Sequence, residues 1–404
     1  MEVFVARQPI FNKILKVHAY ELLFRVGHDK NEFSEIDGDV ATSRVITDSF
    51  LVIGMESLTR GRKAFINFTE NLLMDETATI LPKDDIVVEL LEDIMPTQGI
   101  IDACKKLRDL GYTLALDDFV FEPKFQPLID LAHIIKVDFT LSDEKERAAI
   151  VKKFAPKGIK FLAEKVETQE EFDQAVKDGY TYFQGYFFSK PQIISSKDIP
   201  GNKIAQLKIL QEVNRPEIDF DKIEMIVKSD VSISFKLLRF INSAFFAFST
   251  EIHSIKQALV LMGVREFRKW VSLIIMRGMA SDKPEEILVT SLVRARFCEL
   301  VAKDGNLEDR SSDLFFMGIF SMIDTLMSRP MEEILVDLPL PEDIKGALLS
   351  EEGLIRDLFD LIVAYEAADW DTIDELSEKN GIEQSNLHDH YIKALEWANQ
   401  FLYT

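Results

Sequence analysis

The chain has 404 residues, 47% of them hydrophobic, so a prior of roughly 100–200 residues per domain predicts two or three domains with sizeable cores. Its formal net charge of −22 argues against general nucleic-acid binding and against docking on an anionic membrane, because both need a basic surface. Its two cysteines, Cys104 and Cys298, are too few for a disulfide framework or a thiolate zinc site.

The N-terminal residues 1–13 lack the basic segment and apolar segment of a signal peptide. No apolar run approaches the roughly 20 residues that a membrane span needs. We therefore expect a cytoplasmic protein without a membrane span.

Eight short apolar runs with polar residues at their ends predict buried strands in the first half of the chain. They cover residues 3–6, 18–25, 64–67, 86–91, 113–117, 134–138, 159–164 and 182–184. From Ala64 onward the runs start about 20–27 residues apart, the length of one strand and one helix. Helical patterns lie between them at 97–109 and at 168–177, where Thr168 and Glu171 form a capping-box pattern. Such repeats favour a parallel sheet and, with eight units, a (β/α)8-type barrel.

Polar residues stand at the carboxyl ends of these runs, where the chemistry of such barrels collects. They are Glu21, Asn67, Glu89, Asp117, Asp118, Lys136, Asp138, Glu164, Glu167 and Gln184. Oxygen ligands of this kind suit one or two hard cations better than zinc, and a pair of cations suits phosphoester hydrolysis by an activated water. Taken alone, the paired acids in residues 114–119 (LALDDF) also fit a solvated turn or a helix N-cap.

The same residues fall into seven short motifs. These are E-x-L-x-R at Glu21–Arg25, the asparagine Asn67, E-x-x-E at Glu89–Glu92, the double aspartate Asp117–Asp118, K-x-D at Lys136–Asp138, A-E-x-V-E at Ala163–Glu167, and Q-G-Y at Gln184–Tyr186 with Pro191. In this order and at this spacing, they make residues 1–200 similar to the EAL family of cyclic di-GMP phosphodiesterases. The resemblance implies an EAL barrel of the (β/α)8 type.

Carried over residue by residue, the resemblance implies cyclic di-GMP as the ligand and Mg²⁺ or Mn²⁺ as the cofactor. The metal ligands would be Glu21, Asn67, Glu89, Asp117, Glu167 and Gln184, the catalytic residues Glu164, Lys136 and Asp118, and the substrate contacts Arg25 and Pro191. Glu164 would be the general base, and Asp118 would help to hold a second metal or the nucleophilic water. Lys136 would orient that water or stabilise developing charge.

The chain departs from the family pattern at three places. The Gly-rich loop that follows the double aspartate in the family is replaced here by residues 120–125 (VFEPKF), and neither valine nor proline supplies the conformational freedom of glycine. A threonine position of the family is Leu91, and a glycine position is Lys165. A changed loop should impair hydrolysis before it impairs binding, because turnover needs the more closely held geometry.

The second half of the chain has a different pattern. Residues 191–202 contain two prolines, a glycine and two serines and predict a linker, so we divide the chain into domains at 1–200 and 201–404. Beyond the linker the apolar spacing is helical, with no strand alternation, and predicts an all-helical domain. The stretches Leu237–Ala244 and Ser254–Arg268 are similar to the HDOD domain, which is related to HD phosphohydrolases. An HD dipeptide at His388–Asp389 lacks partners for a metal site, and Asn242 is expected to satisfy buried backbone groups.

The whole chain therefore resembles an EAL–HDOD signalling protein. The preferred reading is a divergent EAL domain that binds cyclic di-GMP or hydrolyses it slowly, with a non-catalytic HDOD domain that contacts a protein partner. A homodimer is a further expectation. Two alternatives stay open, an active metal-dependent phosphodiesterase that releases linear pGpG and a scaffold that uses no nucleotide.

Overall fold

The computed structural model describes residues 3–26, 55–117, 122–189, 201–215, 225, 238–239, 241–242, 252, 255–304 and 307–403. The chain forms two units, one of Met1–Phe188 with Ala364–Trp370 and the other of Ser189–Val363 with Asp371–Thr404. Residues 191–200 of the predicted linker at 191–202 lie outside the described residues, whereas Gly201 and Asn202 begin helix α8 (Gly201–Val213), so the linker prediction was wrong at these two residues. The division at residue 200 stays a prediction.

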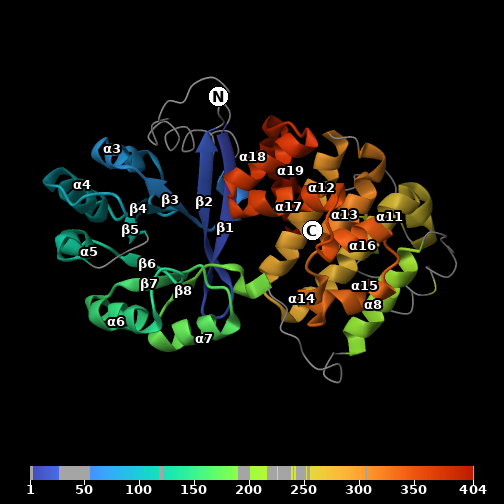
Figure 1. Ribbon diagram of the computed structural model, residues 1–404, viewed down its shortest axis with the longest axis horizontal. Coiled ribbons are helices and arrows are strands. Elements are labelled where there is room, and N and C mark those ends of the chain that lie inside the picture. Colours follow the sequence, from blue (N-terminus) through green and yellow to red (C-terminus); the bar gives the residue numbers. More distant parts are fainter. Residues whose placement is uncertain are drawn as a thin grey trace. The chain divides into compact units, whose positions relative to one another are not determined.

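Eight strands of the first unit close into a barrel in the order β1 to β8 (Figure 1). They are β1 Val3–Asn12, β2 Val17–Val26, β3 Lys63–Phe68, β4 Ile86–Leu90, β5 Thr113–Leu116, β6 Ile134–Asp138, β7 Lys160–Glu164 and β8 Tyr182–Phe183. Each overlaps one of the predicted apolar runs, which confirms the predicted barrel. Strands β2 to β8 are parallel, whereas β1 runs antiparallel to both of its neighbours, β2 and β8.

Helices of this unit lie on the outside of the strands (Figure 1). They are α2 Met55–Thr59, α3 Glu70–Met74, α4 Gln98–Asp109, α5 Gln126–Ile129, α6 Glu144–Phe154 and α7 Gln169–Asp178. The capping box predicted for α7 is present, because the Thr168 hydroxyl accepts from the Glu171 N–H and the Glu171 carboxylate accepts from the Thr168 N–H. Gly179 ends this helix in a left-handed conformation.

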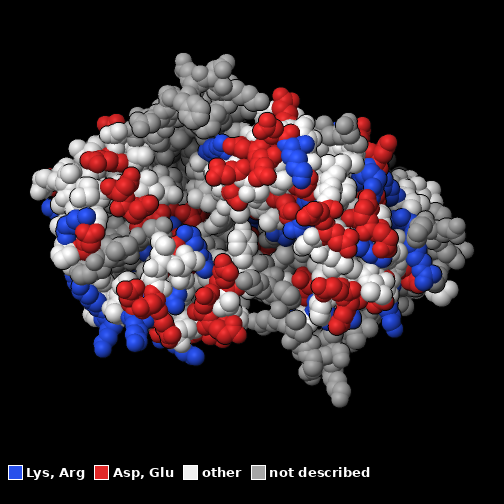
Figure 2. Space-filling model, in the orientation of Figure 1, with Lys and Arg blue, Asp and Glu red and all other residues white. Residues whose placement is uncertain are grey.

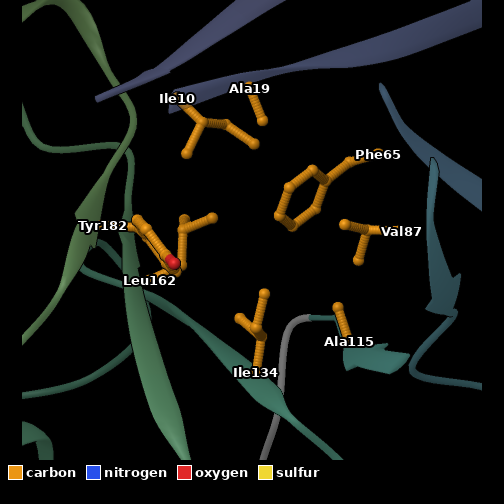
Figure 3. Close-up of a cluster of buried hydrophobic side chains, with 8 residues drawn as sticks. All are labelled: Ile10, Ala19, Phe65, Val87, Ala115, Ile134, Leu162 and Tyr182. Carbon is orange, nitrogen blue, oxygen red and sulfur yellow. The ribbon is translucent and has the colours of Figure 1, made fainter. Parts of the chain in front are cut away.

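A layer of apolar side chains fills the middle of the barrel, with one residue from each strand (Figure 3). The layer consists of Ile10, Ala19, Phe65, Val87, Ala115, Ile134, Leu162 and Tyr182. All eight side chains are buried, so the barrel interior is a packed core and not a channel. The polar residues at the ends of the strands lie directly next to this apolar layer.

The second unit is helical. Its helices are α8 Gly201–Val213, α11 Ile255–Met279, α12 Glu285–Asp304, α13 Ser311–Phe320, α14 Ile323–Met327, α15 Met331–Asp337, α16 Glu342–Leu348, α17 Leu354–Ala367, α18 Trp370–Asn380 and α19 Gln384–Tyr403, with the ends of α17 and α18 at residues 364–370 grouped with the barrel. The all-helical prediction is confirmed for the described residues. Gly318 permits the close approach of α13 to α12, because a Cβ there would lie 2.5 Å from the backbone nitrogen of Ala295.

Asn242 has the structural role expected for it. Its side-chain amide donates to the carbonyls of Leu238 and Ile252, at 3.0 and 2.8 Å, and its oxygen accepts from the N–H of Ile252 at 2.8 Å. The side chain therefore satisfies backbone groups of two separate segments.

Acidic side chains are spread over the face drawn in Figure 2, with basic side chains between them, in keeping with the net charge of −22. Within the described ranges, no helix has the length and apolar character needed to cross a membrane.

Candidate active site

A layer of polar side chains lies directly above the apolar layer of the barrel. Side chains along a strand alternate between its two faces, so the residue two positions from each apolar-layer residue also faces the interior. The eight residues at these positions, here called the polar layer, are Gln8, Glu21, Asn67, Glu89, Asp117, Lys136, Glu164 and Gln184. Seven of the eight are residues expected from the strand ends. Gln8 was missed, because β1 is antiparallel and its polar residue precedes Ile10 in the sequence.

Lys136 gathers the carboxylates of this layer. Its Nζ lies 3.1 Å from Glu21 Oε1, 2.9 Å from Glu89 Oε1, 2.7 Å from Asp117 Oδ1 and 2.9 Å from Glu164 Oε1. The lysine side chain is 1% exposed. One ammonium group thus holds together four acids from β2, β4, β5 and β7.

The pKa values of this cluster follow from burial and charge. Burial lowers the pKa of Lys136, but Glu21 and the other three carboxylates raise it well above the ordinary value, so the ammonium stays charged. Burial raises the pKa of Glu164 to about 8, against the opposing effect of Lys136 and with help from Asp117 and Glu21. Burial also raises the pKa of Glu89 well above its ordinary value.

The raised pKa of Glu164 predicts a pH dependence of stability. Because the folded-state pKa of about 8 exceeds the unfolded value of about 4.3, the folded state binds this proton more tightly, and stability falls as pH rises between those values. Glu164→Gln removes this titration. In a chelator, the variant is expected to gain unfolding free energy relative to the wild type at about pH 8.5, and to gain less at about pH 5.

Urea unfolding at the two pH values measures this effect. The control is Glu378→Gln, at an exposed position on α18, which should shift stability equally at both values. An equal shift for Glu164→Gln as well would contradict the prediction.

Within the part of the chain that the structure describes, several oxygens of the polar layer have no hydrogen-bond partner. They are Asn67 Oδ1, Glu89 Oε2, Glu164 Oε2 and Gln184 Oε1, and all four atoms are buried. Unsatisfied buried oxygens are costly, and Mg²⁺ and Mn²⁺ prefer ligands of this kind. The donor set therefore fits a hard divalent cation. Among the described residues, no group of three or more His, Cys, Asp or Glu is arranged as a metal site, since the carboxylates converge on the Lys136 ammonium.

Two glutamines connect the ends of the barrel strands. The Gln184 amide donates to Glu21 Oε2 at 2.6 Å and to Gln8 Oε1 at 2.8 Å. Gln8 is the strand-register partner of Glu21 on the β1–β2 hairpin. Glu21 is thus held by Lys136 on one side and by Gln184 on the other.

Lys165, at one of the predicted departures from the family pattern, has a left-handed backbone conformation. Its φ of 52° lies in the left-handed region, which favours glycine. Its ammonium bonds to Asp138, a contact between an exposed and a buried side chain. Although burial raises the pKa of Asp138, the hydrogen bonds from Lys165 and Thr140 hold it below the ordinary value. Asp138 therefore anchors the loop after β7, and it is the register partner of Glu164 on β6 and β7.

The remaining predicted site residues are placed differently. Asp118 and Pro191 lie outside the described residues. Glu167 is exposed just before α7, and its N–H donates to Glu171 at 2.8 Å. Arg25, at the end of β2, donates from Nη1 to the carbonyl of Trp370 at 3.1 Å. The roles expected for these four residues stay predictions.

A pocket of about 380 Å³ lies beside the polar layer and shares Asp117 with it. Its apolar lining comes from the ends of β4 and β5, from the segments that follow them, including α5, and from Leu141. The residues are Leu90, Leu91, Ile94, Met95, Leu116, Phe125, Leu128 and Leu141. Leu91 and Phe125 are two of the positions at which we predicted a departure from the family pattern. Their side chains form part of an apolar wall next to the carboxylates. Lys124 Nζ lies 4.9 Å from the Phe125 ring centroid and 3.0 Å from Glu122 Oε2.

Comparison with known proteins covers both halves of the chain. The EAL domain family matches residues 2–191, and the HDOD domain family matches residues 200–333. The uncharacterized protein YuxH of Bacillus subtilis is 38% identical across 100% of this chain and 99% of its own length. The cyclic di-GMP phosphodiesterase CdgJ of Vibrio cholerae is 37% identical across 98% of this chain and 92% of its own length.

Among solved structures, a calcium and cyclic di-GMP complex of BlrP1 from Klebsiella pneumoniae is 25% identical. The match covers 47% of this chain and 56% of BlrP1, with a TM-score of 0.38. At that TM-score the likeness has no bearing on ligand or activity.

Proposed function

Because the chain belongs to the family of proteins that join an EAL domain to an HDOD domain, we propose that its barrel binds cyclic di-GMP and hydrolyses it in a metal-dependent reaction. Water would attack one phosphorus atom and break one ring phosphodiester, which gives the linear dinucleotide pGpG. The observation that carries the proposal is the polar layer, in which four carboxylates surround one buried ammonium. The name of CdgJ, similar over almost its whole length, supports the same reaction.

The polar layer would divide the work among its members. Glu21, Asn67, Glu89, Asp117 and Gln184 would hold Mg²⁺ or Mn²⁺ through their oxygens. A bound divalent cation supplies an activated water and an electrophile for the phosphate oxygens.

Two residues of the same layer would act on the reacting groups. Glu164 would accept the proton of the attacking water. The Lys136 ammonium would face the phosphate oxygens as their charge grows.

The apolar pocket offers a place for one guanine base. A planar base can stack on Phe125, and the exposed carboxylates of Glu92, Asp93 and Glu122 can accept from its N–H groups. The loop change at 120–125 would then leave nucleotide binding intact. The expectation that this loop slows turnover stays a prediction.

The test is hydrolysis by purified full-length protein with cyclic di-GMP and Mg²⁺ or Mn²⁺, with the linear product measured by chromatography. Glu164→Ala is expected to lower turnover by about 10²-fold or more, since a general base contributes roughly 10²–10⁴-fold. Glu21→Ala is also expected to lower turnover, because Glu21 would hold the cation that activates the water. Glu144→Ala, at an exposed position of α6, serves as the control and should keep full activity.

Three outcomes decide between the alternatives. Turnover that survives in both site variants would rule out the proposed mechanism. Calorimetric binding without turnover in the wild type would identify a nucleotide sensor, and neither binding nor turnover would identify a scaffold.

The HDOD domain is proposed as the site of contact with a protein partner. The exposed side chains of Val260 and Leu261, adjacent on α11, support an interaction surface there. The predicted homodimer is checked by sedimentation velocity, in which Val260→Glu would dissociate a dimer formed through this surface.

A further inference from the structure

A short segment from near the end of the chain belongs to the same unit as the barrel. The 364–370 segment contains the last turn of α17 and the first residue of α18. Its turn is closed by a hydrogen bond from the Asp369 N–H to the Ala364 carbonyl at 2.9 Å, and Ala368 has a positive φ of 56°. The rings of Tyr365 and Trp370 meet edge to face at 6.0 Å. The segment is therefore an ordered turn with its own internal packing.

The segment contacts the β1–β2 hairpin at two levels. Gln8 Nε2 donates to the Ala367 carbonyl at 3.1 Å, and Arg25 Nη1 donates to the Trp370 carbonyl at 3.1 Å. The Arg25 guanidinium also lies 6.0 Å from the Trp370 ring centroid, and the Phe4 ring lies 6.4 Å from that ring. A hydrogen bond from a charged donor and a cation–π contact thus act on the same arginine.

These contacts lie on the face of the hairpin that carries the site. Gln8 is the register partner of Glu21, and Phe4 is the register partner of Arg25. Glu21 and Arg25 are four residues apart on β2, so their side chains leave the same face, about 13 Å from each other along the strand. The 364–370 segment therefore lies over the side of β2 from which Glu21 reaches Lys136.

A chain of hydrogen bonds connects the segment with the carboxylate cluster. The Ala367 carbonyl accepts from Gln8, the Gln8 oxygen accepts from Gln184, and the same Gln184 amide donates to Glu21. Glu21 in turn pairs with Lys136. The orientation of each amide is consistent along this path, because each nitrogen donates and each oxygen accepts.

We propose that the 364–370 segment is an autoinhibitory element that competes with the dinucleotide for Arg25. The inference rests on the proposed function, in which Arg25 contacts the dinucleotide. The dinucleotide can bind the Arg25 guanidinium only when Arg25 has broken its contacts with the Trp370 carbonyl and ring. By thermodynamic linkage, nucleotide binding then releases the segment, and any event that withdraws the segment strengthens nucleotide binding. The segment is continuous in the chain with α17 and α18.

The test is calorimetric titration of full-length protein with cyclic di-GMP in Ca²⁺, a hard cation that takes the same oxygen ligands. Trp370→Ala is expected to tighten binding about 5- to 100-fold, the usual range of coupling between sites. Trp370→Phe keeps an aromatic ring beside Arg25 and should bind much like the wild type. In an Arg25→Ala background, Trp370→Ala should change the affinity little, because the competition is gone.

A second measurement follows the emission of Trp370 itself and does not need Trp370→Ala. The fluorescence emission of Trp370 is obtained by subtracting the emission of Trp370→Phe from that of the wild type. Both the Arg25→Ala substitution and added cyclic di-GMP should change this emission. Equal affinity of wild type and Trp370→Ala would overturn the inference and leave the proposed function intact. A gain that persists in Arg25→Ala, or nucleotide binding that leaves Trp370 emission unchanged, would also overturn it. Absence of binding in every variant would remove the proposed function, and the inference with it.

Discussion

Replacement of Lys136 by methionine is expected to cost the protein about 3–5 kcal/mol of unfolding free energy at pH 8 in a chelator, the range for breaking a buried ion pair. Four carboxylates lie within 3.1 Å of its ammonium, and the side chain is 1% exposed. Without the ammonium the acids would repel each other in a site that water hardly reaches.

Two conditions should restore part of the loss. At about pH 5 the raised pKa values of Glu89 and Glu164 let these groups take up protons, and the repulsion falls. Added Mg²⁺ or Mn²⁺ would replace the missing positive charge. Urea unfolding of the variant at both pH values, with and without the cation, measures these effects.

A surface lysine supplies the matched control for Lys136. Lys157 forms a 2.7 Å ion pair with Asp130, and its side chain is 45% exposed. Lys157→Met should change the unfolding free energy by no more than about 1 kcal/mol at either pH. If Lys136→Met proved as stable as Lys157→Met at pH 8, the ammonium would not be what holds the carboxylates together.

Replacement of Gly185 by alanine is expected to destabilise the barrel by about 3 kcal/mol or more, through overpacking and backbone strain together. Gly185 has a φ of +141°, and a Cβ there would lie 2.1 Å from the carbonyl oxygen of Val166 and 2.5 Å from its nitrogen. Both atoms are backbone, so neither can rotate away. The clash would also break the bond from the Val166 N–H to the Gln184 carbonyl, which is 3.0 Å long.

This substitution should affect the site as well as stability. Gln184 precedes the glycine, and Val166 follows Glu164 by two residues, so the strain enters the polar layer from both sides. We therefore expect Gly185→Ala to unfold at a lower temperature and also to lose activity in the hydrolysis assay. Gly158→Ala is the control, because Gly158 also has a positive φ, of +82°, but nothing lies within 4 Å of its added Cβ. A cost of only about 1–2 kcal/mol is expected there. If the two variants were equally stable, the clash with Val166 would not be what destabilises Gly185→Ala.

Strand periodicity predicted most of the polar layer because the same alternation determines both burial and the direction of side chains. Glu89 is the polar residue of the apolar run at 86–91, and its position in the strand places it beside Asn67 and Asp117. The rule failed at Gln8, since nothing local in the sequence shows that β1 is antiparallel. Read backwards from Ile10, the same two-residue step finds Gln8.

Other features depend on contacts between distant residues, which periodicity does not encode. No local pattern marks Trp370 as a neighbour of Arg25. The left-handed conformation of Lys165 could not be predicted either, because the sequence gives the residue type at this position but not its backbone conformation. The ion pair with Asp138 holds the Lys165 side chain while its backbone keeps a conformation that favours glycine.

The antiparallel first strand also determines when the site can form on the ribosome. β1 meets β8 through Phe11 with Phe183 and Asn12 with Tyr182, so the ring closes only after the chain has grown past these residues. At about 5–20 residues per second, roughly 10–40 s separate the synthesis of Gln8 from that of Gln184. Until then the Gln8 side-chain oxygen cannot accept its hydrogen bond from Gln184. Glu21 likewise lacks the hydrogen bond from Gln184 that helps to hold it in place. Any fragment that stops before Gln184 therefore contains most of the site's chemistry but not the bonds that hold it in place.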